Sequence, residues 1–445
     1  MRDLVEPFFN VPTGARLFCN RRYRNGLAGR GEKIMIDFEL EPQILNQLKM
    51  YHMVSEQMMR PISRECDEHE HQKPTQFYES MWSASAAASD VQIGHDKSKS
   101  TQAPKAAAPR RATLLTVLST EELCWGDAGL YLSTPNPGLG GAAVMAAGTP
   151  EQKEHFLKRF KEGKPKWGAM AITEPGFGSD SSAVTTTATR DGDHWVIDGT
   201  KIFVTAGQMA AEKSEGFVVV WATVDKSAGR AGIKPFVVEH NTPGMTVTRV
   251  ENKLGIRASD TAMIVLDNCR IPLDNILGSA EVRKEGGFKD VMATFDATRP
   301  IVAAMALGVG RAALDFVRDF LKGQNVAIRY GISPRRLTAV ERDFMEMEVQ
   351  LQAARLLTWR AAWMLDTGKR NSLEASMAKA KAGLAVTLIT QKAVELLGPL
   401  GYSRKILVEK WMRDAKINDI FEGTQQINMI IIARRILNYS SKELN

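Results

Sequence analysis

The chain has 445 residues, of which 44% are apolar and 24% charged, and its formal net charge is +7. This is the composition of an ordinary soluble globular protein, and the length accommodates two or three domains. No apolar run reaches the roughly 18 residues of a membrane-spanning helix, and the four scattered cysteines exclude a disulfide framework or a cysteine metal site. The basic charge favours a polyanionic partner, either a phosphate-bearing coenzyme or nucleic acid.

The N-terminal segment 1–34 carries several arginines among polar residues, without a helical or strand period. We interpret it as a poorly ordered tail or an over-extended start before Met35, with a transit-like leader as the alternative; the apolar core of a secretory signal is missing. From Ile36 to Met59 the apolar residues recur three and four apart, which predicts an amphipathic helix.

Residues 84–111 are rich in Ala, Ser and Lys, and this composition predicts a flexible loop because it offers little apolar surface to bury. Helical patterns resume over Ala112–Asp127 and Thr149–Lys161. Thr149 is suited to cap the second of these helices, with Pro150 at its first position.

The pattern changes after Trp167, where Gly and Pro separate short runs rich in Val, Ile, Thr and Phe. Such runs at this spacing predict the strands of an antiparallel barrel or sandwich. The clearest predicted strands are His194–Ile197, Phe217–Val224, Ile233–Glu239 and Met263–Leu266.

Long helical patterns return after the strands, over residues 340–366 and 374–397 and over a run that Pro300 opens toward Leu321. Gly398 stands where a helix C-terminus needs a residue with positive φ. We therefore predict an α+β chain with a helical domain at 35–164, a β domain at 165–280 and a helical domain at 281–445.

Two motifs within the β domain combine turn residues, hydroxyls and an aromatic side chain. Thr173–Asp180 is a turn-rich loop whose glycines permit close approach to a ring system, although a plain β-turn explains it equally well. Lys201–Thr205 is a strand that ends on Phe203 and a hydroxyl, and taken alone it is typical of core.

The third motif places a carboxylate at a chain reversal. Trp411–Ile417 leads into Ile420–Thr424, where Glu422 stands between an aromatic residue and a glycine just before a helical run over Gln426–Leu437. A lone glutamate at such a place is more often a solvated loop residue or a cap.

Taken together in this order, the three motifs resemble those of the acyl-CoA dehydrogenase family, closest to its medium-chain members. The resemblance runs from about Ile36 to Asn438 without the 84–111 insertion, and it includes Asp296–Pro300, Arg360–Trp363 and Val408–Lys410. It implies an N-terminal helical domain, a middle antiparallel β-barrel domain and a C-terminal helical bundle.

The resemblance also implies an enzyme that binds FAD and an acyl-CoA, with Glu422 as the catalytic base and no metal. The positions that match flavin-binding residues of the family are Thr173, Ser179, Phe203, Thr205, Thr424 and Gln426. The positions that match the coenzyme A and acyl side are Ser179, Asp296, Arg299 and Arg434.

In the family, the glutamate removes the α-proton of the thioester while a hydride leaves the β-carbon for flavin N5, and electrons pass on to an electron-transfer flavoprotein. We expect burial to raise the pKa of Glu422, and its N–H to help stabilise the enolate oxygen. Other members carry the base just before the arginine of the helix after the β domain. That position is Thr298 here, which cannot act as a base.

The sequence departs from the family in the segments with which homomeric members reach the flavin of a neighbouring subunit. An Arg-x-x-Phe-Gly loop becomes Ala327–Gly331, a His-Gln pair becomes Leu337 and Thr338, and a Gln before Gly-Gly-x-Gly becomes Glu395 before Gly398–Gly401. Either Arg329, Arg335 or Arg336 reaches the phosphates instead, or a different subunit completes the site in a heterotetramer rather than a homotetramer.

Two other functions compete with the dehydrogenase. An acyl-CoA oxidase differs by admitting oxygen to the reduced flavin. A nucleic-acid-associated protein on the same fold would explain the basic charge, but the basic residues do not gather in one region with interleaved aromatics. We expect a cytoplasmic bacterial enzyme, or a mitochondrial matrix enzyme if residues 1–34 are a transit peptide.

Overall fold

The computed structural model describes residues 40–93, 111–282, 289–439 and 443. The predicted tail at 1–34 and most of the predicted loop at 84–111 lie outside these residues. The chain divides into a unit that ends at Pro42 and a unit from Gln43 to Asn445, and the fold of the second unit follows.

The first part of this unit is helical, as predicted. Its α-helices are α1 (Pro42–Val54), α2 (Arg60–Glu68), α3 (Thr75–Ile93), α4 (Ala112–Gly126), α5 (Ala128–Ser133), α6 (Gly138–Ala147) and α7 (Pro150–Leu157). Thr149 caps α7 in a reciprocal capping box with Gln152, which confirms the predicted start.

Two predicted boundaries in this part are wrong. Within the described residues, the first helix begins at Pro42, and a π-helical turn (Ser55–Met59) separates it from α2. Helix α3 continues to Ile93, ten residues into the predicted flexible loop at 84–111. The alanines of that stretch have a high helix propensity, which the compositional argument for disorder neglected.

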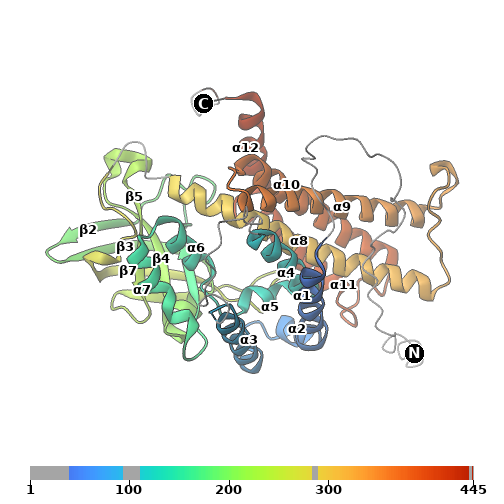
Figure 1. Ribbon diagram of the computed structural model, residues 1–445, viewed down its shortest axis with the longest axis horizontal. Helices are drawn as coiled ribbons and strands as arrows, with labels where there is room; N and C mark the ends of the chain where they lie inside the picture. The colour runs from blue at the N-terminus through green and yellow to red at the C-terminus, as the bar shows by residue number, and fades with distance from the viewer. Residues whose placement is uncertain (1–39, 94–110, 283–288, 440–442, 444–445) are drawn as a thin grey trace, which may run out of the picture. The chain divides into compact units, whose positions relative to one another are not determined.

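The β domain is one curled sheet of seven strands (Figure 1). Its strands are β1 (Gly168–Ala171), β2 (Thr187–Asp191), β3 (His194–Thr205), β4 (Phe217–Thr223), β5 (Ile233–Glu239), β6 (Met245–Val250) and β7 (Thr261–Pro272). The four predicted strands are all present, although β3 and β7 are longer than expected.

Most strand pairs are antiparallel, as predicted, but β4 pairs in parallel with β1 and, through its last residue, with the first residue of β2. A parallel pair needs a long connection, and the chain between β1 and β4 supplies it. Strand β4 is buried along its whole length, because its alternate side chains enter two core clusters, Val218 and Val220 one of them and Val219 and Trp221 the other.

The last part of the chain consists of long helices that run alongside one another (Figure 1). They are α8 (Lys289–Gly323), α9 (Ala339–Asp366) and α10 (Ser372–Leu397), followed by the shorter α11 (Val408–Ala415) and α12 (Gln425–Leu437). Gly398 has a φ of 56° at the end of α10, as its position predicted.

Pro300 does not open a helix, contrary to the prediction, because α8 begins at Lys289 and continues through it. A proline inside a helix leaves the carbonyl four residues earlier without its usual donor. That carbonyl belongs to Asp296, and the Nδ2 of the buried Asn371 donates to it at 3.2 Å. A residue that precedes α10 therefore compensates for the proline in α8.

The hydrophobic cores connect these parts. One cluster joins Met59, Phe77 and Tyr78 of the N-terminal helices to the inner face of the sheet, and another fills the space among α8, α9, α10 and α11. Thr294–Gly323 is apolar and long enough to cross a membrane, but 78% of its most apolar window is buried inside the fold. This burial is typical of a core helix.

Candidate active site

The Glu422 carboxylate stands on a strained turn between the 3-10 helix Lys416–Asp419 and α12. Its φ is 56° and that of Gly423 is 91°. A left-handed conformation is costly for a glutamate and persists where the surroundings hold it, which is common at functional sites. The prediction that Glu422 lies at a chain reversal is therefore confirmed.

Thr298 lies directly against this carboxylate, although the two residues are far apart in sequence. Its hydroxyl donates to Glu422 Oε2 at 2.9 Å from the buried face of α8. Burial raises the pKa of Glu422 above its usual value of 4.5, while the Thr298 hydrogen bond and the charges of Arg299 and Lys379 oppose that rise. The carboxyl group is thus tuned in the direction that a general base requires.

Arg299 and Asp296 form a second pair beside the same turn. An Arg299 guanidinium nitrogen donates to Asp296 at 3.2 Å, and the Ser372 hydroxyl also donates to this carboxylate. Arg299 is 3% exposed and its Nε has no hydrogen-bond partner within the described residues. A buried guanidinium group with an unsatisfied N–H is a candidate contact for an anionic or carbonyl ligand.

On the β domain, a buried ion pair anchors the Thr173–Asp180 loop. Lys201 Nζ, on β3, donates to Glu174 at 2.8 Å, and both side chains are at most 2% exposed. Glu174 also accepts from the N–H groups of Thr185 and Thr186 at 2.8 and 3.0 Å. Sequence reasoning missed this pair, because nothing in the spacing of residues 174 and 201 links them.

The predicted aromatic wall is exposed rather than part of the core. Phe203 has a φ of 55° and is 60% exposed, in a stretch of β3 where the register with β7 shifts. Ile202, on the same strand, donates its N–H to the Thr173 carbonyl at 2.9 Å. The two predicted flavin-binding motifs of the β domain are therefore in direct contact.

The other predicted residues have less distinct surroundings. Thr205 is half-buried at the end of β3, opposite Thr261, and Ser179 and Gln426 are exposed. Thr424 caps α12 by accepting from the Ile427 N–H at 3.3 Å. Arg434 is partly buried, and its Nε has no partner within the described residues.

The structure thus brings the predicted residues together in two groups. One group surrounds Glu422 and consists of Thr298, Arg299, Asp296 and Thr424. The other group lies on the β domain and joins Thr173 to the strand that carries Phe203 and Thr205. Lys379, on α10, also belongs at the turn, because its Nζ donates to the Gly423 carbonyl at 2.7 Å. The sequence contains no signal for it beyond its helical period.

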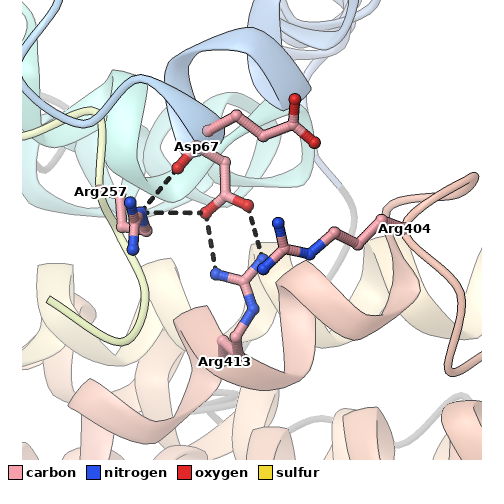
Figure 2. A pocket seen from close by; sticks show the side chains of 5 residues that line it. Asp67, Arg257, Arg404 and Arg413 are labelled. Carbon is pink, nitrogen blue, oxygen red and sulfur yellow. Dashed lines mark hydrogen bonds and ion pairs between the residues drawn. The ribbon is translucent and has the colours of Figure 1, made fainter.

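The Trp411–Ile417 motif serves as a junction rather than as part of the site. Asp67 of α2 and three arginines line a cavity of about 300 Å³. Figure 2 shows Arg413 and Arg257 converging on Asp67, with Arg404 nearby. Arg413 donates to both carboxylate oxygens of Asp67, and its Nε to Glu409 at 2.8 Å. Since these charges are paired with one another, we interpret the cavity as a structural ion-pair network.

Comparison with known proteins supports the architecture over most of the chain. Residues 169–269 match the acyl-CoA dehydrogenase middle domain, and residues 285–437 match the acyl-CoA dehydrogenase C-terminal domain. The short-chain specific acyl-CoA dehydrogenase of Bos taurus is 39% identical over 322 residues, which are 72% of this chain and 75% of that protein.

Solved structures agree with the fold. The butyryl-CoA dehydrogenase of Megasphaera elsdenii superposes with a TM-score of 0.77 at 31% identity, covering 90% of this chain and all of that one. A structure described as the electron transferring flavoprotein of Acidaminococcus fermentans superposes with a TM-score of 0.76 at 30% identity, covering 91% of this chain and 100% of that chain.

These matches define the chain as an FAD-dependent oxidoreductase. It belongs to the acyl-CoA dehydrogenase family, as the three motifs predicted. The relatives named above are short-chain and butyryl-CoA enzymes, whereas the motifs suggested the medium-chain members of the same family.

The residues present fit FAD. An added Cβ at Gly176 or Gly178 would meet nothing within 4 Å, so the backbone of the β-domain loop is open to close approach by a ligand. At the start of α12, the buried oxygens Gln425 Oε1 and Asn428 Oδ1 have no partner within the described residues. The motifs assign both segments to flavin binding, and an accessible loop backbone together with unsatisfied buried oxygens is suited to a large polar ring system.

Proposed function

We propose that this chain catalyses the α,β-dehydrogenation of an acyl-CoA thioester to the trans-2-enoyl-CoA, with Glu422 as the base. The observation that carries the proposal is the strained Glu422 turn, where burial raises the pKa of a carboxyl group that Thr298 orients. The hydride from the β-carbon would leave for the acceptor that bound FAD supplies. The α-proton goes to Glu422, so a saturated acyl group loses two hydrogens.

The chain also offers stabilisation for the enolate oxygen. The Glu422 N–H makes no hydrogen bond to another group of the described chain, so it is free to donate to a thioester oxygen beside the carboxylate. An unaided carboxylate is too weak a base for the α-proton, and such a donor lowers the barrier by stabilising the developing charge. Thr173, Phe203, Thr205 and Thr424 would hold the flavin, with Ser179 and Gln426 at its edge.

Arg299, Asp296 and Arg434 would face the coenzyme A and pantetheine portion. The unsatisfied Nε atoms of Arg299 and Arg434 support this assignment. Two named relatives, the short-chain enzyme of Bos taurus and the butyryl-CoA dehydrogenase, favour a short acyl chain. The Acidaminococcus fermentans structure favours an electron-transfer flavoprotein as the electron acceptor.

The test is anaerobic flavin reduction in the flavin-loaded protein, assembled with its partner subunit where the chain alone holds too little flavin. A panel of acyl-CoAs from four carbons upward is added, and the reaction is followed in the visible spectrum. We expect a short acyl-CoA to bleach the flavin, and Glu422→Gln to slow the bleaching by about 10²–10⁴-fold, the usual contribution of a general base. Wild-type bleaching in Glu422→Gln would contradict the assignment. Rapid reoxidation by oxygen after bleaching would favour an acyl-CoA oxidase.

We also propose that this chain is the catalytic subunit of a heteromeric enzyme, because its partner-facing arm (residues 327–338 and 395–401) is poorly suited to flavin phosphates. Among the three candidate arginines, Arg329 is committed to the buried Glu341, with Nε at 2.7 Å and a terminal nitrogen at 2.8 Å from its carboxylate oxygens. Glu395 adds a negative charge, and Pro399 lacks an N–H.

An exposed stripe on α12 supports an assembly of some kind. Met429, Ile430 and Ile436 are 52%, 43% and 57% exposed, and an apolar stripe of this kind is typical of a subunit contact. We expect the chain purified alone to hold little flavin and to gain it with a second acyl-CoA dehydrogenase subunit. A flavin-saturated homotetramer of this chain alone would rule out the heteromer.

The cellular compartment of the enzyme depends on whether the chain is bacterial or mitochondrial. We propose the bacterial cytoplasm, or the mitochondrial matrix if residues 1–34 are removed as a transit peptide. The N-terminal sequence of the protein isolated from its native cells distinguishes the two.

A further inference from the structure

Lys379 is a buried lysine whose partner is a backbone carbonyl beside Glu422. It lies on α10 and is 1% exposed, and its Nζ donates to the Gly423 carbonyl at 2.7 Å. Lys201 and Lys410 are equally buried, but each pairs with a carboxylate, at 2.8 Å to Glu174 and 2.7 Å to Asp127. Burying an ammonium group without a carboxylate partner is costly. The hydrogen bond from Lys379 to an uncharged carbonyl at the candidate site therefore needs an explanation.

The same carbonyl has a second, uncharged donor. Asn428 is fully buried on α12, and its Nδ2 donates to Gly423 O at 2.9 Å and to Thr424 O at 3.0 Å. Lys379 and Asn428 therefore hold the Gly423–Thr424 peptide, one residue beyond Glu422, from two different helices. A left-handed glutamate persists only when its surroundings hold it in this way.

The charge of Lys379 acts on the carboxylate as well. Three charged groups face Lys379: Glu422 on the turn, Asp419 at the preceding 3-10 helix and Arg299 on α8. Burial lowers the pKa of Lys379 to about 8, with Asp419 and Glu422 opposing that shift. Conversely, the Lys379 charge opposes the burial that raises the pKa of Glu422.

We propose that Lys379 is a positioning residue for Glu422. It fixes the turn that presents the carboxylate by binding the Gly423 carbonyl, and its positive charge stabilises the ionised form that accepts the α-proton. The proposal rests on the proposed function, since it assumes that Glu422 is the base.

The test compares variants that separate the hydrogen bond from the charge. Lys379→Met removes both, Lys379→Gln keeps a donor without the charge, and Asn428→Ala keeps the charge but removes the second donor. Lys381→Met is the matched control, because Lys381 lies on the same helix and donates to Gln350 away from the turn. Each variant is assayed for the rate constant of flavin reduction by butyryl-CoA across pH, for affinity toward a non-reducible acyl-CoA analogue, and for its thermal midpoint.

We expect Lys379→Met to lower the rate of flavin reduction at neutral pH by about tenfold or more, since a misplaced base loses much of its contribution. The rising limb of the pH profile should move to higher pH, because the ionised carboxylate has lost a stabilising cation. Lys379→Gln should show the same pH shift with a smaller loss of rate. Asn428→Ala should lower the rate of flavin reduction without shifting the pH profile. Lys381→Met should have the wild-type rate and pH profile.

The positioning role is wrong if Lys379→Met and Lys379→Gln keep the wild-type pH profile, or if they lose analogue affinity as strongly as rate. Should Lys379→Met fail to fold, as its thermal midpoint would reveal, Lys379→Gln decides on its own. Glu422→Gln separates the two proposals. If it reduces flavin at the wild-type rate, the base assignment fails, whereas an inactive Glu422→Gln beside unshifted Lys379 variants refutes only the positioning role.

Discussion

Glu422 and Thr298 lie 124 positions apart in the sequence and share a hydrogen bond of 2.9 Å. The family resemblance implies that members carry the base at one of these two positions. Their contact explains how both positions serve the same reaction, because a carboxylate on α8 or on the turn would reach nearly the same point. In this chain the threonine instead donates a hydrogen bond to Glu422, the proposed base.

The first prediction concerns this donor. Thr298→Val preserves the shape of the side chain but removes a hydrogen bond that opposes the burial-induced rise in the pKa of Glu422. The pKa of Glu422 should therefore rise further, so the pH profile of flavin reduction moves to higher pH and the rate at neutral pH falls several-fold. Stopped-flow reduction across pH is the measurement. A profile that moves to lower pH would contradict the hydrogen-bond direction seen here.

At the scale of elements, β3 and the Thr173–Asp180 loop are held together by the Glu174–Lys201 pair. Burial alone would raise the pKa of Glu174, but the hydrogen bonds from Lys201, Thr185 and Thr186 lower it to about 2. A pKa below the unfolded value means that the ionised carboxylate stabilises the fold above about pH 4.5. This contribution is lost as pH falls toward 2.

The second prediction follows from this pair. Lys201→Met leaves a buried, uncompensated carboxylate, and it should lower the free energy of unfolding by about 3–5 kcal/mol at neutral pH. The deficit should shrink as pH falls and Glu174 takes up a proton. Urea unfolding at pH 7 and pH 4 measures both effects. Arg270→Met is the control, because its pair with Asp191 on the same sheet is exposed and worth at most about 1 kcal/mol.

The sequence predicted the order of elements well because apolar period and capping residues are local signals. The α7 cap at Thr149 and the position of Gly398 are examples. It failed at Pro300, where the compensating donor is Asn371, 71 positions further along the chain. Glu422 could be found through a resemblance, whereas Lys379 and the Glu174–Lys201 pair depend on contacts between distant segments. No sequence period reports such contacts.

At the scale of the whole unit, α11 joins segments from all three predicted domains. Lys410 Nζ donates to Asp127, between α4 and α5, at 2.7 Å and to Asp414 on its own helix. Asp414 in turn accepts from the N–H of Ile256, in the loop after β6. These three charged side chains are each 1% exposed. These buried ion pairs therefore form a junction between the helical parts and the β domain.

The last prediction tests this junction. Lys410→Met leaves Asp127 and Asp414 buried without their cation, so the free energy of unfolding should fall by about 3–5 kcal/mol. The double variant Lys410→Met with Asp414→Asn should recover part of the loss, because one of the two uncompensated charges is removed. Lys416→Met is the control, since Lys416 is 54% exposed and its pair with Asp419 should contribute at most about 1 kcal/mol. Urea unfolding followed by circular dichroism and by flavin release gives both readouts. Equal stability of Lys410→Met and Lys416→Met would mean that the junction does not hold the domains together, and earlier flavin release in Lys410→Met alone would show that it does.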